Sequence, residues 1–344
     1  MIADLLIVIL VLLVAAMLMA PLESLYWWAT RGAEEVDKDG KPSTKLVAGR
    51  EVVSSILEHQ PDAEEPQTPA PDDGTPKKFL VYLSGIGAIG AHEVPDEEYP
   101  FVEDLKTYLP SYVVIDDVFP YAVDNRGLTA ERMLGGMWKK LESIRLKNPN
   151  ALLAALINLR NLLQLFVCAD RRYGPTYNMG TAGEIYESLV RHGHRTGNPD
   201  EVILYGWSGG GQIALGAAWY LDALGLQVSV LSMGGMLSDD IALARIHHLW
   251  HLYGTEDPLQ ALGPKLFAGR WPIATSSPWN VAKREGKITM WPLGPIHHNV
   301  KEHYFDRENT LPDGRTYSQT VIDAVVGILE HDKLPNGEPA NTPM

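Results

Sequence analysis

The sequence has little cysteine and little positive charge. Cys168 is the only cysteine among 344 residues, which excludes an internal disulfide framework, and its apolar neighbours Leu165, Phe166 and Val167 predict a buried, inert thiol. There are 29 lysines and arginines against 43 aspartates and glutamates, so the formal net charge is −14. A chain of this charge is repelled by phosphate backbones and by anionic lipid surfaces. We therefore expect no nucleic acid partner.

The sequence also lacks internal repeats and a tight metal-binding motif. Its clustered histidines are His247, His248, His251, His297, His298 and His303. None of them shows the H-E-x-x-H spacing that places two metal ligands on one helix face. We therefore predict neither a metal nor a cofactor. With 45% hydrophobic residues, the chain fits one large domain with appendages, or at most two small domains.

An uninterrupted apolar run of membrane length occurs only within residues 1–28. Leu5–Leu22 is a run of 18 residues without a charge. As a helix it would be about 27 Å long, just enough to cross a hydrocarbon core. Residues 26–28 are Tyr-Trp-Trp, the composition of an interfacial aromatic belt. We expect residues 1–28 to be a single transmembrane anchor. The alternative is a signal peptide cleaved near residues 14–16, although no lysine or arginine precedes the run.

The segments that flank the anchor indicate its orientation and the limits of the folded domain. Basic residues follow the run but none precedes it, so the positive-inside rule favours a cytoplasmic domain. A cleaved signal peptide would instead give a secreted protein. Residues 29–77 are expected to form a juxtamembrane, Pro- and acid-rich linker that cannot bury a core. We expect the folded domain to span residues 78–335 and residues 336–344 to be a disordered tail.

Short apolar runs alternate with helical patterns through the predicted domain. The expected strands are Phe79–Ser84, Tyr112–Phe119, Glu201–Tyr205, Val228–Ser232, Leu249–Tyr253 and Lys287–Pro292. The expected helices are Tyr99–Leu109, Gly183–His192, Gln212–Leu224 and Tyr317–His331. This alternation predicts an α/β fold with a mostly parallel sheet.

Residues 122–176 interrupt this alternation and are mainly helical by pattern. Within them Ala151–Val167 is leucine-rich. The polar residues that interrupt this stretch are Asn158, Arg160, Asn161 and Gln164. They favour an amphipathic helix that packs on the domain over a second membrane span. The insertion is either a cap over the active site or a surface helix.

A nucleophile elbow is predicted at Gly206-Trp207-Ser208-Gly209-Gly210, between a strand and a helix. Glycines at 206 and 210 remove side chains that would collide in so sharp a turn. The turn pushes the Ser208 hydroxyl out of the backbone and points the first helix amides at the same place. The alternative is a glycine-rich turn whose serine only caps the helix.

Two later loops supply an acid and a base. The strand at 249–253 is followed by Gly-Thr-Glu-Asp-Pro, with Asp257 as the acid and Glu256 expected to be solvated. The last strand is followed by Pro-Ile-His-His-Asn at 295–299. Each motif lies at the carboxyl end of a strand, where parallel sheets gather their loops. The order Ser…Asp…His over residues 78–331 resembles that of the α/β-hydrolase superfamily.

The resemblance implies an α/β-hydrolase fold with helices on both faces of the sheet and a helical insertion after an early strand. It implies a triad of Ser208, Asp257 and His298, with an oxyanion hole formed by the N–H groups of Gly209 and Ile86. The alternatives are Asp239 or Asp240 as the acid and His297 or His303 as the base.

The predicted function is that of a membrane-anchored serine hydrolase, which cleaves an ester or thioester through an acyl-serine intermediate without a cofactor. The anchor and the leucine-rich insertion suggest a lipophilic acyl substrate. An acyltransferase would use the same residues. A non-catalytic α/β-hydrolase scaffold used for binding is the alternative from another class.

Overall fold

The computed structural model describes residues 76–86, 94–120, 161–170, 174–299, 301–334 and 336–340. The expected anchor at residues 1–28 lies outside the described residues, as do almost all of the linker and most of the insertion. Among the residues that are described, no helix has both the length and the apolarity to cross a membrane.

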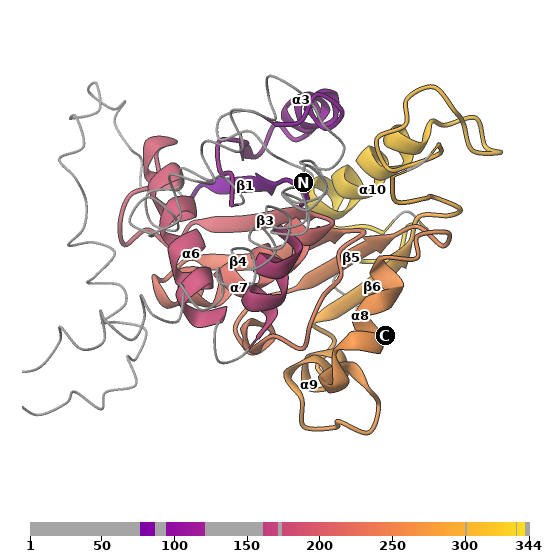
Figure 1. Cartoon of the computed structure of the whole chain (residues 1–344). Helices are drawn as coiled ribbons and strands as arrows, with labels where there is room; N and C mark the ends of the chain where they lie inside the picture. Colours follow the sequence, from indigo (N-terminus) through magenta and orange to yellow (C-terminus); the bar gives the residue numbers. More distant parts are fainter. Residues whose placement is uncertain are drawn as a thin grey trace, which may run out of the picture.

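The described core is a six-stranded sheet in which every pairing is parallel (Figure 1). Its strands are β1 (Lys78–Leu83), β2 (Val113–Ile115), β3 (Glu201–Trp207), β4 (Gln227–Met233), β5 (Leu249–Tyr253) and β6 (Ile288–Pro292). The order across the sheet is β2-β1-β3-β4-β5-β6. The chain therefore moves outward from β1 to β2 and then returns to the other side of β1. This reversal places a topological switch point between β1 and β3, where ligand sites of such sheets form.

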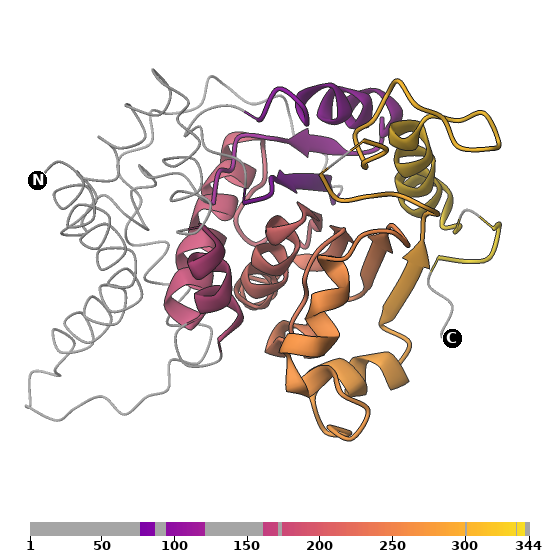
Figure 2. The same ribbon diagram turned by 45° about the vertical axis from the view of Figure 1, so that its right-hand side comes forward.

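Helices cover both faces of the sheet, as predicted. The longer helices are α3 (Tyr99–Tyr108), α6 (Gly174–Arg191), α7 (Gly209–Ala223), α9 (Pro278–Arg284) and α10 (Tyr317–His331). Residues alternate along β1, so that Phe79 and Val81 pack with α6 and α7, whereas Leu80 and Tyr82 pack with α3 and α10. Figure 2 shows from a second direction how these helices are divided between the two faces of the sheet. The alternation yields two separate hydrophobic layers, one on each face.

Several element boundaries differ from the prediction. Helix α7 begins at Gly209, directly after the serine, and α6 begins at Gly174. Strand β2 ends before Asp116 and Asp117, whose carboxylates pair with Lys106 and Arg191. The segment between β5 and β6 forms helices that were not predicted. The short ones are η3 (Gln260–Leu262), α8 (Gly263–Leu266) and η4 (Ala268–Arg270), and η2 (Ile241–Ala244) follows β4.

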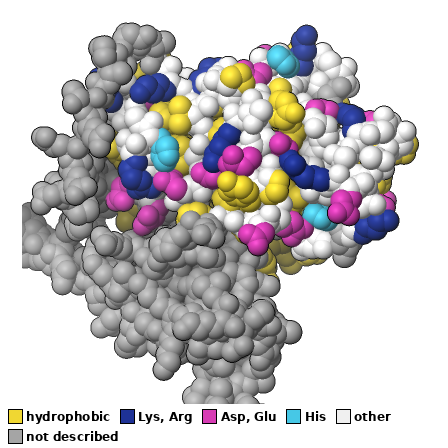
Figure 3. Space-filling view, turned by 90° about the horizontal axis from the view of Figure 1, so that it is seen from above, with side chains coloured by type: hydrophobic (Ala, Val, Ile, Leu, Met, Phe, Trp, Pro, Cys, Tyr) yellow, Lys and Arg dark blue, Asp and Glu magenta, His cyan; other side chains and the backbone are white. Residues whose placement is uncertain are grey.

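The carboxyl-terminal residues also differ from expectation. Residues 336–340 were expected to be disordered, but Ala340 is fully buried and its carbonyl accepts the indole N–H of Trp250 at 3.0 Å. An isolated bridge joins Lys333 to Pro339. The buried indole on β5 needs an acceptor, and the polar composition of the tail gave no sign that it supplies one. In the view from above, the described surface mixes acidic, basic and apolar side chains (Figure 3).

Candidate active site

Ser208 lies at the turn between β3 and α7, in a strained backbone conformation. Its φ is 51° and its ψ is −120°, values that residues other than glycine rarely adopt. A Cβ on Gly206 would be 2.4 Å from backbone atoms of Gly210, and a Cβ on Gly210 would be 2.3 Å from the Leu83 carbonyl. Both positions therefore require glycine. The Ser208 N–H donates to the Met233 carbonyl at 2.9 Å, which ties the turn to β4.

The structure brings Ser208, His298 and Asp257 together. The distance from Ser208 Oγ to His298 Nε2 is 2.9 Å, and His298 Nδ1 is 2.8 Å from Asp257 Oδ2. His298 and Asp257 are buried, whereas Ser208 is partly exposed. Because an ionised carboxylate can only accept, Nδ1 holds the imidazole proton and Nε2 presents its lone pair to the serine.

Asp257 is held in its ionised form by several donors. Burial opposes ionisation, but hydrogen bonds from His298, the Tyr304 hydroxyl and the Leu259 N–H outweigh it and lower the pKa of Asp257. The Tyr304 hydroxyl donates to Oδ2 at 2.8 Å, and the Leu259 N–H donates to Oδ1 at 2.9 Å. Such a carboxylate can orient an imidazole and stabilise the imidazolium that forms during proton transfer.

Two aromatic residues of this site were missed by sequence reasoning. Tyr304 is fully buried, and its hydroxyl accepts the Gly254 N–H at 2.7 Å while it donates to Asp257. Trp207 stacks on His298, with ring centroids 4.5 Å apart and an interplanar angle of 23°. Trp207 was visible inside the elbow motif, but its partner lies 91 positions along the chain. No local pattern reports such a contact.

The alternative acids and bases have other partners. Asp240 caps η2 by accepting a hydrogen bond from the Ala242 N–H at 2.9 Å. Asp239 lies near Arg270, and its negative charge raises the pKa of that guanidinium. His303 pairs with Glu97 at 3.3 Å. His297 is partly exposed, and its backbone N–H donates to the Glu302 carbonyl. None of these contacts joins an alternative residue to Ser208 in the described part of the chain.

The two expected oxyanion donors lie on either side of the serine. Gly209 is the first residue of α7, so its N–H has no acceptor within the helix. The loop after β1 lies against the nucleophile, since a Cβ on Gly85 would be 3.2 Å from Ser208 Cβ. In this loop the Ile86 carbonyl accepts Asn161 Nδ2 at 2.8 Å. Among the backbone hydrogen bonds between described residues, none is donated by the Ile86 N–H.

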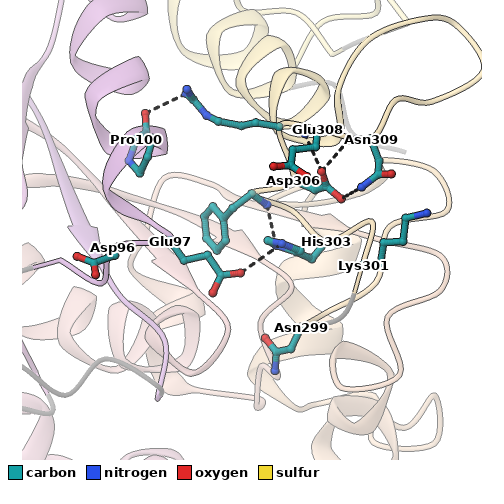
Figure 4. A pocket seen from close by; sticks show the side chains of 11 residues that line it. Asp96, Glu97, Pro100, Asn299, Lys301, His303, Asp306, Glu308 and Asn309 are labelled. Atoms are coloured by element: carbon teal, nitrogen blue, oxygen red, sulfur yellow. Dashed lines mark hydrogen bonds and ion pairs between the residues drawn. The ribbon is translucent and has the colours of Figure 1, made fainter. Parts of the chain in front are cut away.

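A cleft of about 560 Å³ opens beside the histidine loop (Figure 4). It lies between Asp96 and Glu97, which precede α3, and the segment from Asn299 to Asn309 after β6. His303 points across it to Glu97 (Figure 4). Its lining is mainly charged and polar, and Asn299 directly follows His298. None of the three triad residues lines the cleft, so its polar surface is connected to them through the loop that carries His298 and Asn299.

Several histidine, cysteine and acidic side chains away from the triad are buried or paired within the fold. His194 and Asp200 form a buried pair at 2.6 Å near the start of β3. Burial lowers the pKa of His251 to about 3, and burial raises the pKa of the Cys168 thiol, as expected for an inert cysteine. Over the residues that the structure describes, no group of three or more His, Cys, Asp or Glu side chains is arranged to hold a metal.

Comparisons with known proteins were made for the whole chain. No family model matches it, and neither does any curated protein. Among solved structures, the chain is similar to a crystal structure of dienelactone hydrolase from Anabaena variabilis. The identity is 15%, the match covers 74% of this chain and 87% of that chain, and the TM-score is 0.38. A likeness this distant says nothing about activity, so the function has to come from the site itself.

Proposed function

We propose that this protein is a serine hydrolase that cleaves an ester or thioester through an acyl-serine intermediate. The observation that carries the proposal is the continuous chain of contacts from Ser208 Oγ through His298 to Asp257, at 2.9 Å and 2.8 Å. A serine hydroxyl is a weak nucleophile at neutral pH unless an adjacent base removes its proton. Here the base is within hydrogen-bond reach and is itself oriented by a carboxylate.

In the first half of the reaction Ser208 Oγ attacks the acyl carbon while His298 Nε2 takes the hydroxyl proton. The carbonyl oxygen becomes an oxyanion, which the N–H groups of Gly209 and Ile86 stabilise. The tetrahedral intermediate then collapses, the bond to the leaving group breaks, and His298 returns its proton to the leaving oxygen or sulfur. The products of this half are the free alcohol or thiol and the acyl-serine.

In the second half a water molecule replaces the leaving group. His298 takes one proton from the water as its oxygen attacks the acyl carbon. The second tetrahedral intermediate expels Ser208 Oγ, which recovers the proton from His298. The acid is released and the enzyme returns to its initial state. An acyltransferase would differ only in using another hydroxyl, thiol or amine in place of water, so the two activities are separated by adding such acceptors.

The anchor and the acyl preference form part of the proposal. Leu5–Leu22 has the length of one membrane span, so the full chain should stay in the membrane fraction after a carbonate wash. Release into the medium of a chain that begins near residue 17 would identify a signal peptide instead. An anchored enzyme meets lipophilic acyl groups, and esters of increasing chain length test this preference.

The decisive experiment is covalent labelling with a fluorophosphonate, which reacts with activated serines. The wild-type protein should be labelled and Ser208→Ala should not be. Ser238→Ala is the control, because Ser238 is a buried serine whose hydroxyl lacks a hydrogen-bond partner, and hence a base, in the described structure. Full labelling of Ser208→Ala would refute Ser208 as the nucleophile. An unlabelled wild-type protein would favour the non-catalytic scaffold.

A further inference from the structure

A buried carboxyl group lies beside the loop that follows β1. Glu98 is the N-cap residue of α3, yet its side chain accepts no N–H group of that helix. The side chain turns inward instead, where Glu98 is only 5% exposed and the Tyr82 hydroxyl donates to its Oε2 at 2.8 Å. Acidic residues at N-caps usually bind the free N–H groups of their helix. The inward position of Glu98 therefore serves another purpose.

The Glu98 carboxyl group also lies next to the loop. The Ser84 side chain and the Gly85 N–H are near enough to favour its ionised form, which lowers its pKa. Ser84 and Gly85 directly follow β1, and Gly85 lies against the Ser208 side chain. The buried Asn161 amide binds the Ile86 carbonyl at 2.8 Å. The loop therefore lies between the Glu98 carboxyl group and the Asn161 amide.

We propose that Glu98 is a positioning residue of the oxyanion hole, whose carboxylate fixes Ser84 and Gly85 so that the Ile86 N–H stays beside the Ser208 hydroxyl. The inference rests on the proposed hydrolase function. An unpaired buried carboxylate would be costly, and the Tyr82 hydroxyl together with the neighbouring Ser84 and Gly85 offsets that cost. An oxyanion donor is effective only when it is already in place, and one such donor contributes about 10²- to 10³-fold to kcat.

If Glu98 acts through its negative charge, its protonation should lower kcat. A residue with a purely structural role would not produce this pH dependence. Burial raises the pKa of Glu98 to about 7, against the opposing hydrogen bonds from Tyr82, Ser84 and Gly85, and the nearby Glu97 carboxylate raises it further. A protonated acid has lost its charge and one acceptor site, so it holds neighbouring donors more weakly than the carboxylate does.

Three other titratable groups surround this carboxyl group. They are Tyr82 on β1, Tyr205 on β3 beside it, and Glu97, which pairs with His303 from the loop after β6. Burial raises the pKa of both tyrosines well above the usual value, so both stay neutral donors near pH 7. The ionisation expected near pH 7 in this cluster is therefore that of Glu98.

The test uses Glu98→Ala and Glu98→Gln in the full chain, with Glu97→Gln as the control. Glu98→Ala should lower kcat about 10²-fold, with KM within about twofold, because the transition state loses a placed donor. Glu98→Gln keeps one acceptor for the Gly85 N–H and should lose less than about tenfold. Glu97→Gln should retain kcat within about twofold, since Glu97 is exposed.

The pH dependence of kcat supplies the second readout. Glu98→Gln resembles the protonated acid, so the ratio of wild-type to variant kcat should rise severalfold from about pH 5.5 to about pH 8.5. Glu97→Gln removes a charge that raises the pKa of Glu98, so its ratio should be about 1 at high pH and fall below 1 only at the acid end. This readout needs only the isosteric variant, so it holds even if Glu98→Ala fails to fold.

Two results would overturn the inference alone: unchanged kcat in folded Glu98→Ala, or a pH-independent ratio for Glu98→Gln while wild-type Ser208 still reacts with fluorophosphonate. A wild-type protein that does not react would overturn the hydrolase proposal and this inference together.

Discussion

The indole ring of Trp207 lies flat against the imidazole ring of His298, with centroids 4.5 Å apart and planes at 23°. Trp207 immediately precedes Ser208 and also contacts Tyr304 and Phe305, at centroid distances of 4.9 Å and 5.1 Å. The residue next to the nucleophile therefore fixes the ring plane of the proposed base. Two elements far apart in the sequence are joined by this stack.

Replacing Trp207 should weaken turnover without removing the nucleophile. Trp207→Leu removes the aromatic surface under His298, so we expect kcat to fall about tenfold or more because the imidazole loses its orientation. Trp207→Phe keeps a ring and should lose less. Steady-state kinetics on a short-chain ester measure both, and slow but complete fluorophosphonate labelling should persist. Equal kcat in the two variants would show that stacking is not the cause.

The three candidate histidines can be ranked by alanine substitution. His298→Ala should lower esterase turnover by about as much as Ser208→Ala, at least about 10³-fold, because triad members act as a unit. His297→Ala and His303→Ala should each lose less than about tenfold, since neither contacts Ser208. A larger loss in His297→Ala than in His298→Ala would move the base to His297 and leave the mechanism unchanged.

Tyr304→Phe should destabilise the domain and reduce the part of its stability that depends on the ionisation of Asp257. The variant loses a donor to Asp257 and the acceptor of the Gly254 N–H, which predicts a loss of about 1–3 kcal/mol in the free energy of unfolding. The pKa of Asp257 is lowered in the folded state, so its contribution is present above the ordinary carboxyl pKa and lost as the pH falls below it.

Without the tyrosine hydroxyl the pKa of Asp257 moves back toward the ordinary value, so less stability should be lost as the pH falls and the loss should end at a higher pH. Urea unfolding at several pH values measures both effects. Tyr253→Phe, on a tyrosine that stacks on His251 without touching Asp257, is the control. Identical pH profiles for wild type and Tyr304→Phe would contradict the assigned role.

The buried His251 should make the folded domain labile to acid. Burial lowers its folded-state pKa to about 3, and Arg270 adds to this shift. The unfolded chain takes up a proton near pH 6.5, the ordinary value, whereas the folded state does not until much lower pH. The contribution of His251 to stability is therefore fully present above about pH 6.5. Below that pH it lowers the free energy of unfolding by about 1.4 kcal/mol per pH unit.

His251→Gln should reduce this slope by about 1.4 kcal/mol per pH unit and leave the part supplied by the buried His248, whose pKa burial lowers to about 4. The stability of His251→Gln at neutral pH is expected to be lower because the contact of His251 with Ser232 at 3.1 Å is altered. His247→Gln, on an exposed histidine four positions earlier, should leave the slope as it is. Chemical unfolding between about pH 5 and about pH 7.5 provides the comparison. A slope as steep in His251→Gln as in the wild type would assign it to other groups.

The sequence by itself determined most of the elements and the order in which the site residues follow them. Leu249–Tyr253 and Tyr317–His331 have the same bounds in the structure as in the prediction, because apolar runs and helical periodicity are local properties. The glycines of the elbow could also be interpreted from the sequence, because a side chain at Gly206 or Gly210 would collide with neighbouring backbone in the turn.

Only the tertiary structure decided which side chains meet. The strand order that places the loop after β1 beside Ser208, the stack of Trp207 on His298, the Tyr304 hydroxyl on Asp257 and the inward turn of Glu98 all join distant segments. Such contacts depend on how helices and strands pack across the sheet, and burial then sets the pKa of each group. A linear pattern records which residues are present after each strand, whereas their distances, partners and protonation arise from the packing of the whole domain.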